Sequence, residues 1–215
     1  MESNPEGAEA VSAIGLDLVA PEVYAPMLRK LVLAATGVGV GAALLAATAL
    51  SWPTAVAIGA IVGVPTIAYA LAIRRRRIWM AGTTIHVQRV FGERRVELSE
   101  TTGAELLVYP SRLSRIVLRV TAGPETQIIP LAMYTDSGSG RELHLLGLRT
   151  LADALATSRL AAAVAVSDVL VHQLRAEARD AALGDRPLYK AVRLARANDT
   201  VSPVVLTDSE VAELG

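Results

Sequence analysis

The hydrophobic pattern divides the chain into one long uncharged stretch and a following region of short alternating segments. Residues 31–73 contain no charged side chain, which is about twice the ~20 apolar residues that a helix needs to cross a bilayer. The sequence Ser-Trp-Pro-Thr at residues 51–54 interrupts this stretch, and Pro53 cannot continue a preceding helix. We therefore predict two transmembrane helices, Leu28–Leu50 and Thr54–Ile73, joined by a tight turn.

Basic residues flank the predicted hairpin at its two ends and are absent from its turn. Arg29 and Lys30 precede the first apolar segment, and Arg74, Arg75, Arg76 and Arg77 follow the second. The positive-inside rule then predicts a multi-pass protein of the inner (plasma) membrane with both termini in the cytoplasm. We expect these bases to lie at the lipid head groups, and Trp52 to lie at the opposite interface, which tryptophan prefers.

Each predicted helix carries two glycines four residues apart, Gly37 with Gly41 and Gly59 with Gly63. Such pairs of small residues allow helix backbones to approach closely in a membrane. If the turn centres near residue 52, Gly41 and Gly63 lie at equal depth, so we expect the helices to pack there. The alternative is that glycine is simply frequent in membrane helices.

Beyond Arg77 the apolar residues alternate with polar ones, as in half-buried strands. Six short segments with this pattern recur at a spacing of about ten residues, which is typical of an antiparallel meander or a small barrel. Pro130 marks an edge or a bulge in the fifth segment. The six predicted strands lie near residues 84–88, 95–98, 106–108, 116–120, 127–134 and 143–145.

A helical period returns after the predicted sheet. Leu148, Leu151 and Leu155 form one apolar stripe, which could close the sheet. A second helix is expected over residues 160–183, before Gly184 and Pro187, either covering the sheet or pairing with another subunit. A short helix over 188–198 and a tail over 200–215 follow, in which residues 201–206 could add a strand.

These patterns predict an α+β membrane protein with four parts. They are a polar, partly disordered N-terminal arm (1–27), a transmembrane helical hairpin (28–77), a cytoplasmic β domain (78–159), and a C-terminal helical extension and tail (160–215). Residues 82–87, Gly-Thr-Thr-Ile-His-Val, and 94–98, Arg-Arg-Val-Glu-Leu, resemble the opening hairpin of the bacterial pleckstrin-homology-like (PH-like) membrane proteins. The order of hairpin, arginine cluster, sheet and helix also resembles that family. The resemblance implies scaffolding or regulation at a membrane, without chemistry.

The zero net charge of the 215 residues hides a strongly basic block. Residues 74–119 hold ten arginines against four glutamates, where anionic head groups would meet them. Beyond anchoring, Arg94, Arg95 and Arg119 are candidates for contact with an anion or a partner, and the alternative is that they are solvated strand positions. The nineteen arginines and two lysines suit a GC-rich genome, such as that of an actinobacterium.

Candidate catalytic and metal-binding residues are scarce. The chain has no cysteine, which excludes disulfides and thiol chemistry. His86, His144 and His172 lack metal-ligand spacing, and the few aromatic residues argue against nucleic-acid binding. We therefore expect no enzyme activity, cofactor or metal, and expect membrane lipids and proteins, including further copies of the chain, as partners.

Two functions follow from these expectations. The first is a non-enzymatic accessory or scaffold protein, which presents a PH-like domain for the assembly or regulation of a larger membrane complex. The alternative is a ligand-gated oligomeric membrane effector, whose β domain senses a small anionic molecule.

Overall fold

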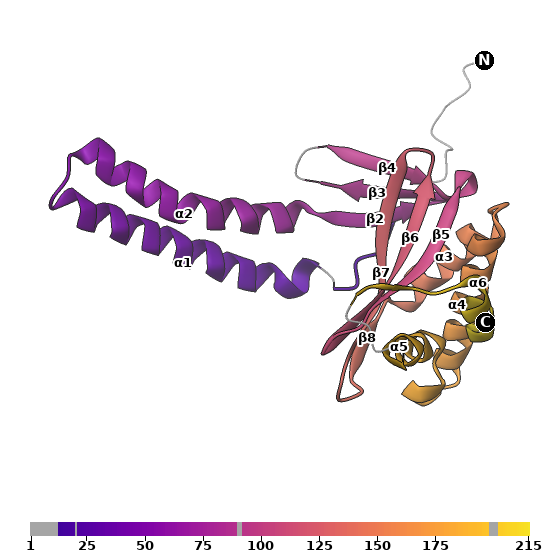
Figure 1. The fold of residues 1–215 in the computed structure, drawn as a ribbon. Helices are drawn as coiled ribbons and strands as arrows, with labels where there is room; N and C mark the ends of the chain where they lie inside the picture. Colours follow the sequence, from indigo (N-terminus) through magenta and orange to yellow (C-terminus); the bar gives the residue numbers. More distant parts are fainter. Residues whose placement is uncertain (1–12, 20, 90–91, 198–201) are drawn as a thin grey trace, which may run out of the picture. The chain divides into compact units, whose positions relative to one another are not determined.

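The computed structural model describes residues 13–19, 21–89, 92–197 and 202–215, which belong to two compact units. The hairpin unit comprises Val19–Arg77 and Val87–Arg94. The sheet unit comprises Met1–Leu18, Ile78–His86 and Arg95–Gly215. Apolar helices thus come first in the chain, and antiparallel sheets and C-terminal helices follow (Figure 1).

The hairpin unit is built from two long helices, α1 (Pro21–Ala47) and α2 (Trp52–Arg75). At a rise of 1.5 Å per residue these are about 40 Å and 36 Å long, and both are long and apolar enough to span a membrane. Ser51 is the N-cap of α2, and Pro53 lies in its first turn, where a missing N–H costs nothing. The first helix begins seven residues before the predicted Leu28, so residues 21–27 are helical and not part of an irregular arm.

The two helices pack through small residues. A Cβ placed on Gly59 would lie 2.6 Å from the carbonyl oxygen of Gly39 and 2.8 Å from the Cβ of Ala43. A Cβ on Gly63 would lie 3.2 Å from the carbonyl oxygen of Ala35. Because the backbones approach this closely, only small residues fit along the contact.

The predicted pairing of Gly41 with Gly63 is wrong. A Cβ on Gly37 or on Gly41 would meet nothing within 4 Å, whereas one on Gly39 would lie 2.9 Å from the carbonyl oxygen of Gly59. Two residues along a helix are about 200° apart, so Gly39 faces away from Gly37 and Gly41. The contact face of α1 is therefore formed by Ala35, Gly39 and Ala43.

The strands form two sheets. The first has the order β1-β2-β3-β4 and the second the order β8-β7-β6-β5-β9. The short helix η1 (Leu98–Glu100) follows β4 in the chain. The strands are β1 (Ile14–Gly15), β2 (Arg77–Ala81), β3 (Thr84–Gln88), β4 (Glu93–Glu97), β5 (Gly103–Tyr109), β6 (Leu113–Ala122), β7 (Glu125–Thr135), β8 (Gly140–Glu142) and β9 (Val204–Val205).

The predicted irregularity at Pro130 is a bulge in β7. Val117 of β6 pairs with Pro130 and the preceding Ile116 pairs with Ala132, so Leu131 is the extra residue. Proline cannot donate to the sheet ladder, and a bulge accommodates it. The side chain of Leu131 is fully buried.

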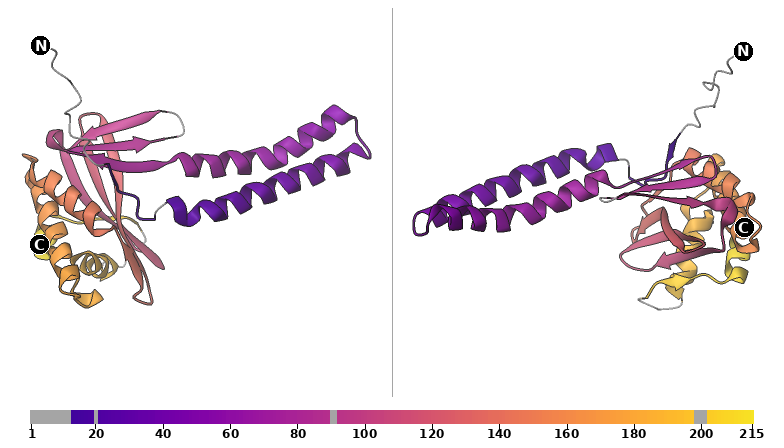
Figure 2. Two further views of the ribbon diagram at one scale, coloured as in Figure 1. Left: turned by 180° about the vertical axis from the view of Figure 1, so that it is seen from behind. Right: turned by 90° about the horizontal axis from the view of Figure 1, so that it is seen from above.

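Helices gather on one side of the five-stranded sheet (Figures 1 and 2). Leu148, Leu151 and Leu155, the predicted stripe, are fully buried, and both α4 and α5 contact β5. Residues 161–178 therefore cover the sheet of their own chain. The elements are α3 (Leu145–Ala156), α4 (Ala161–Ala178), η2 (Leu183–Asp185), α5 (Pro187–Ala197) and α6 (Asp208–Leu214).

Three predicted segments need correction. Ile14 pairs with Met80 of β2, and Leu16 is fully buried, so this part of the arm belongs to the sheet unit; residues 1–12 lie outside the described residues. The predicted sixth strand is shifted, because β8 ends at Glu142 and Leu145 already begins α3. The expected tail contains α6, whose capping box joins Thr207 and Glu210, and residues 204–205 do add a strand, β9.

Candidate functional site

Two adjoining grooves lie in the hairpin unit. The basic groove has a volume of about 800 Å³ and is lined by Leu71, Arg74, Arg75, Arg77, Gln88, Arg89, Gly92 and Glu93. The apolar groove has a volume of about 380 Å³ and is lined by Ala25, Pro26, Leu28, Arg29, Val32, Ala70, Leu71 and Arg74. Leu71 and Arg74 line both, so the two grooves meet at these side chains.

The backbone distributes the predicted anchor arginines unequally between these grooves. The second helix ends at Arg75, Arg76 has an extended backbone (φ −74°, ψ 118°), and β2 begins at Arg77. Arg74, Arg75 and Arg77 line the basic groove, whereas Arg76 lines neither groove. Arg29 lines the apolar groove; Lys30 lines neither, and Trp52 lies at the other end of α2 and is exposed.

Arg89 belongs to the basic block of the sequence, and it also lines the basic groove. It follows β3, and its backbone N–H donates a hydrogen bond to the carbonyl oxygen of Gly92 at 3.0 Å. Gly92 has a φ of +86°, a conformation that glycine adopts without strain. This reversal of the chain places Arg89 and Gly92 on the same groove as Arg74.

The three arginines proposed for contact with an anion or a partner lie on two strands, β4 and β6. Arg119 pairs with Glu105 directly across β5 and β6, and its Nε donates to Glu105 Oε2 at 2.6 Å. Its charge is therefore engaged within the sheet. Arg94 and Arg95 are neighbours on β4, and successive side chains of a strand point to opposite faces. Contact of Arg94 or Arg95 with an anion or a partner stays a prediction.

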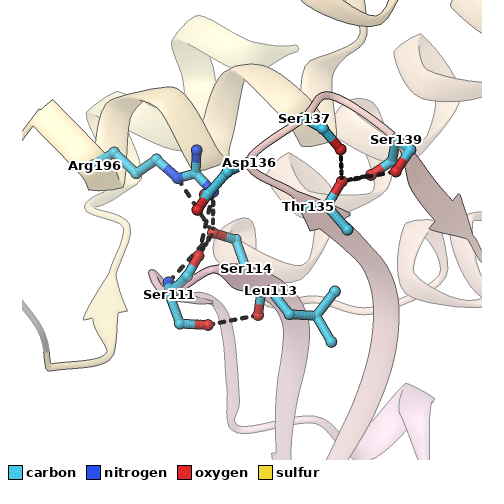
Figure 3. Close-up of polar contacts among 8 residues, drawn as sticks. All are labelled: Ser111, Leu113, Ser114, Thr135, Asp136, Ser137, Ser139 and Arg196. Atoms are coloured by element: carbon cyan, nitrogen blue, oxygen red, sulfur yellow. Dashed lines mark hydrogen bonds and ion pairs between the residues drawn. The ribbon is translucent and has the colours of Figure 1, made fainter.

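A polar cluster in the sheet unit joins α5 to two turns (Figure 3). Arg196 Nη2 donates to Asp136 Oδ1 at 2.7 Å, to Ser114 Oγ at 2.9 Å and to the Ser111 carbonyl oxygen at 3.3 Å. The Ser114 hydroxyl donates in turn to the Ser111 carbonyl oxygen at 3.0 Å. Since arginine stays protonated and cannot take a proton from a serine, the cluster fixes the end of α5 and does not activate a nucleophile.

A second polar network surrounds Glu142. Its Oε1 accepts from the Tyr134 hydroxyl at 2.5 Å, and its Oε2 accepts from Gln173 Nε2 at 2.8 Å and from Arg186 Nη1 at 3.0 Å. Gln173 Oε1 accepts from the Leu188 backbone N–H at 3.1 Å. Tyr134 and Gln173 are buried, so the network links β7, β8, α4 and α5 through groups that have lost water.

The ionisation of this network fits a structural role. Burial, together with the hydrogen bond to Glu142, raises the pKa of Tyr134 far above its ordinary range, so its hydroxyl remains a donor. Burial and the nearby charge of Glu142 raise the pKa of Glu177, and Arg186 opposes this shift. Glu177 Oε2 is buried with no hydrogen-bond partner among the described residues. The charged form of Glu177 therefore lowers the stability of the folded state.

Two of the histidines make local contacts. The His86 ring stacks on Trp79 with a centroid distance of 5.4 Å, and His172 Nδ1 lies 2.9 Å from the Asp168 carbonyl oxygen. Within the part of the chain that the structure describes, no three His, Asp or Glu side chains are grouped so that they could hold a metal ion. The basic and apolar grooves are therefore the strongest candidate site.

Comparison with known proteins returns no relative. No family model, no curated protein and no solved structure matches the chain.

Proposed function

We propose that the chain is a non-enzymatic integral membrane protein of the accessory or scaffold class. In this proposal α1 and α2 cross the plasma membrane, both termini lie in the cytoplasm, and the sheet unit is a PH-like domain that serves the assembly or regulation of a larger membrane complex. The observation that carries the proposal is the distribution of large and small apolar residues over the two helices.

The residues that the two helices bury are small, and many of their large apolar side chains are exposed. Leu33, Leu45 and Ile61 are 64%, 76% and 73% exposed, while Ala55, Gly59, Gly63 and Ala70 are the buried residues of α2. In an apolar stretch of 18 residues in each helix, only 6% of the residues of α1 and 17% of those of α2 are buried. A core helix of a soluble protein buries its large apolar side chains, and soluble monomers rarely expose so extensive an apolar surface. Hydrocarbon around the hairpin accounts for both features.

The arrangement of the sheet unit supports the PH-like part of the proposal. Antiparallel sheets precede α3, and its leucines pack into the core, in the order that the resemblance implies. The expected opening hairpin corresponds to β3 and β4, where Thr84 Oγ1 donates to Glu97 Oε2 at 2.5 Å. Burial raises the pKa of Glu97, but hydrogen bonds from Thr83, Thr84 and Ser99 together lower it below its ordinary value, so this carboxylate stays an acceptor.

The ligand-gated effector is less well supported. That alternative placed the anion at Arg94, Arg95 or Arg119 of the β domain. Arg119 is already paired with Glu105, and Arg94 and Arg95 point to opposite faces of β4. The accessory role is therefore the function that we propose.

The test of this function is the composition of the native assembly. Full-length tagged protein, extracted in mild detergent, is expected to elute with co-purifying subunits or further copies of itself, at a protein mass well above the 22.6 kDa of one chain. Light scattering measures that mass, and mass spectrometry identifies the partners. A strictly monomeric protein without partners at native expression would contradict the proposal.

A further inference from the structure

We propose that the basic and apolar grooves together hold one anionic phospholipid, with its phosphate among the arginines and one acyl chain along the apolar groove. This inference rests on the proposed membrane insertion and deepens it, because it makes the lipid a specific ligand. Three features of the grooves carry it: their charge, their shared side chains and their place on the helices.

The basic groove gathers positive charge from separate elements. Arg74 and Arg75 end α2, Arg77 begins β2, and Arg89 follows β3. Guanidinium groups remain charged at any physiological pH and match the geometry of phosphate oxygens. Glu93 also lines the groove, but its single negative charge is outnumbered by the four arginines, so the groove has a net positive charge. An anion bound among them would offset their mutual repulsion.

The apolar groove selects the kind of anion. Leu28 and Val32 of α1 line it together with Ala70 and Leu71 of α2. Because Leu71 and Arg74 line both grooves, the surface passes directly from cationic to apolar. A free phosphate would satisfy only the first part of this surface, whereas an anionic lipid satisfies both. The volume of about 380 Å³ is in the range of small-molecule sites.

The grooves also lie where such a lipid would be. Arg29 and Arg74 border the uncharged stretch of residues 31–73, so in a membrane they lie at the level of the head groups. General attraction to an anionic surface would involve every arginine of the run equally. A specific site instead distinguishes Arg74, which lines both grooves, from Arg76, which lines neither.

The experiment measures lipid retention by full-length protein in phosphatidylcholine–detergent micelles containing a minor fraction of phosphatidylglycerol. Native mass spectrometry counts the phosphatidylglycerol molecules that stay bound. We expect one on the wild type and one on R76Q. The double variant R74Q/R89Q, whose replaced side chains are exposed, is expected to bind it about tenfold to thirtyfold more weakly. Ala25→Phe, at an exposed position of the apolar groove, should weaken it without a change of charge.

Three results would overturn the proposal. They are no retained lipid on the wild type, equal retention by R74Q/R89Q and R76Q, and displacement of the lipid by glycerol phosphate at equal concentration, which would indicate an anion site without acyl recognition. Unchanged melting temperatures show that the variants are folded. Failure of the proposed function is distinguishable, because a protein that co-purifies with partners but holds no lipid refutes only this inference.

Discussion

Replacing Gly59 with leucine is expected to destabilise the helical hairpin by about 3 kcal/mol or more, the upper part of the range for overpacked contacts. The new Cβ would lie 2.6 Å from the Gly39 carbonyl oxygen and 2.8 Å from the Ala43 Cβ. Because the nearest atom is backbone, α1 must move as a whole to make room. Thermal unfolding of the full-length protein in detergent, followed by far-ultraviolet circular dichroism, measures the loss.

Gly37→Leu is the matched control for this prediction. It makes the same chemical change in α1, at an exposed position where a Cβ meets nothing within 4 Å. We expect its stability to remain within about 0.5 kcal/mol of the wild type. If Gly37→Leu proved as destabilising as Gly59→Leu, the contact face of α1 would be the one containing Gly37 and Gly41, and the packing described above would be wrong.

Replacing Glu142 with alanine is expected to cost about 3 kcal/mol of the stability of the sheet unit, as for a broken buried ion pair. The change removes the acceptor of three hydrogen bonds, from Tyr134, Gln173 and Arg186. The side chains of Arg186 and Glu142 are only 22% and 10% exposed, so water cannot fully replace the lost partner. Denaturant unfolding of the full-length protein, monitored by tyrosine fluorescence, provides the measurement.

Two comparison variants define this effect. Asp153→Ala removes an i,i+4 pair with Arg149, in which both side chains are more than 70% exposed, and should cost at most about 0.5 kcal/mol.

Glu177→Gln should instead stabilise the unit at neutral pH. The pKa of Glu177 is raised in the folded state, so stability is greatest below the unfolded pKa and falls as pH rises through the folded one. The gain from Gln should therefore vanish in acid. Equal losses in the Glu142 and Asp153 variants would contradict the network.

The sequence predicted the hairpin but not its contact face. An uncharged stretch of this length indicates helices that are long and apolar enough to span a membrane, and the structure has two. The alternating glycines Gly37, Gly39 and Gly41, however, put small residues on both sides of α1. Which side meets α2 depends on the angle at which α2 returns from the turn, and no residue pattern within α1 specifies that angle.

Alternation predicted the strands β3 to β7, whereas β2 (Arg77–Ala81) and the shortest elements were not predicted. Ile14–Gly15 is a strand only because it pairs with β2, more than sixty residues later, and two residues cannot show a period. The last helix, by contrast, had a readable signal, since Thr207-Asp208-Ser209-Glu210 is a capping-box sequence. This capping box before Val211 and Leu214 would have been sufficient to predict α6, in place of the expected tail.

The sequence predicted that the candidate site is basic, but it did not predict which arginines line it. The basic run of residues 74–77 was evident, but only the turn at Gly92 adds Arg89 to the groove. Arg119 was a reasonable candidate until the register of β5 and β6 placed Glu105 opposite it. The place of Arg89 depends on the turn at Gly92, and the pairing of Arg119 depends on the register of β5 and β6. Alternation of apolar and polar residues specifies neither.

The central claim, a membrane hairpin with both ends inside the cell, is most directly tested by single-cysteine labelling. The chain contains no cysteine, so Ala49→Cys near the turn and Ser209→Cys near the C-terminus each supply one reactive site at an exposed position. A membrane-impermeant maleimide is expected to label Ala49→Cys in intact cells and Ser209→Cys only after permeabilisation. Labelling of Ser209→Cys in intact cells, or recovery of the full chain in the soluble fraction, would contradict the account.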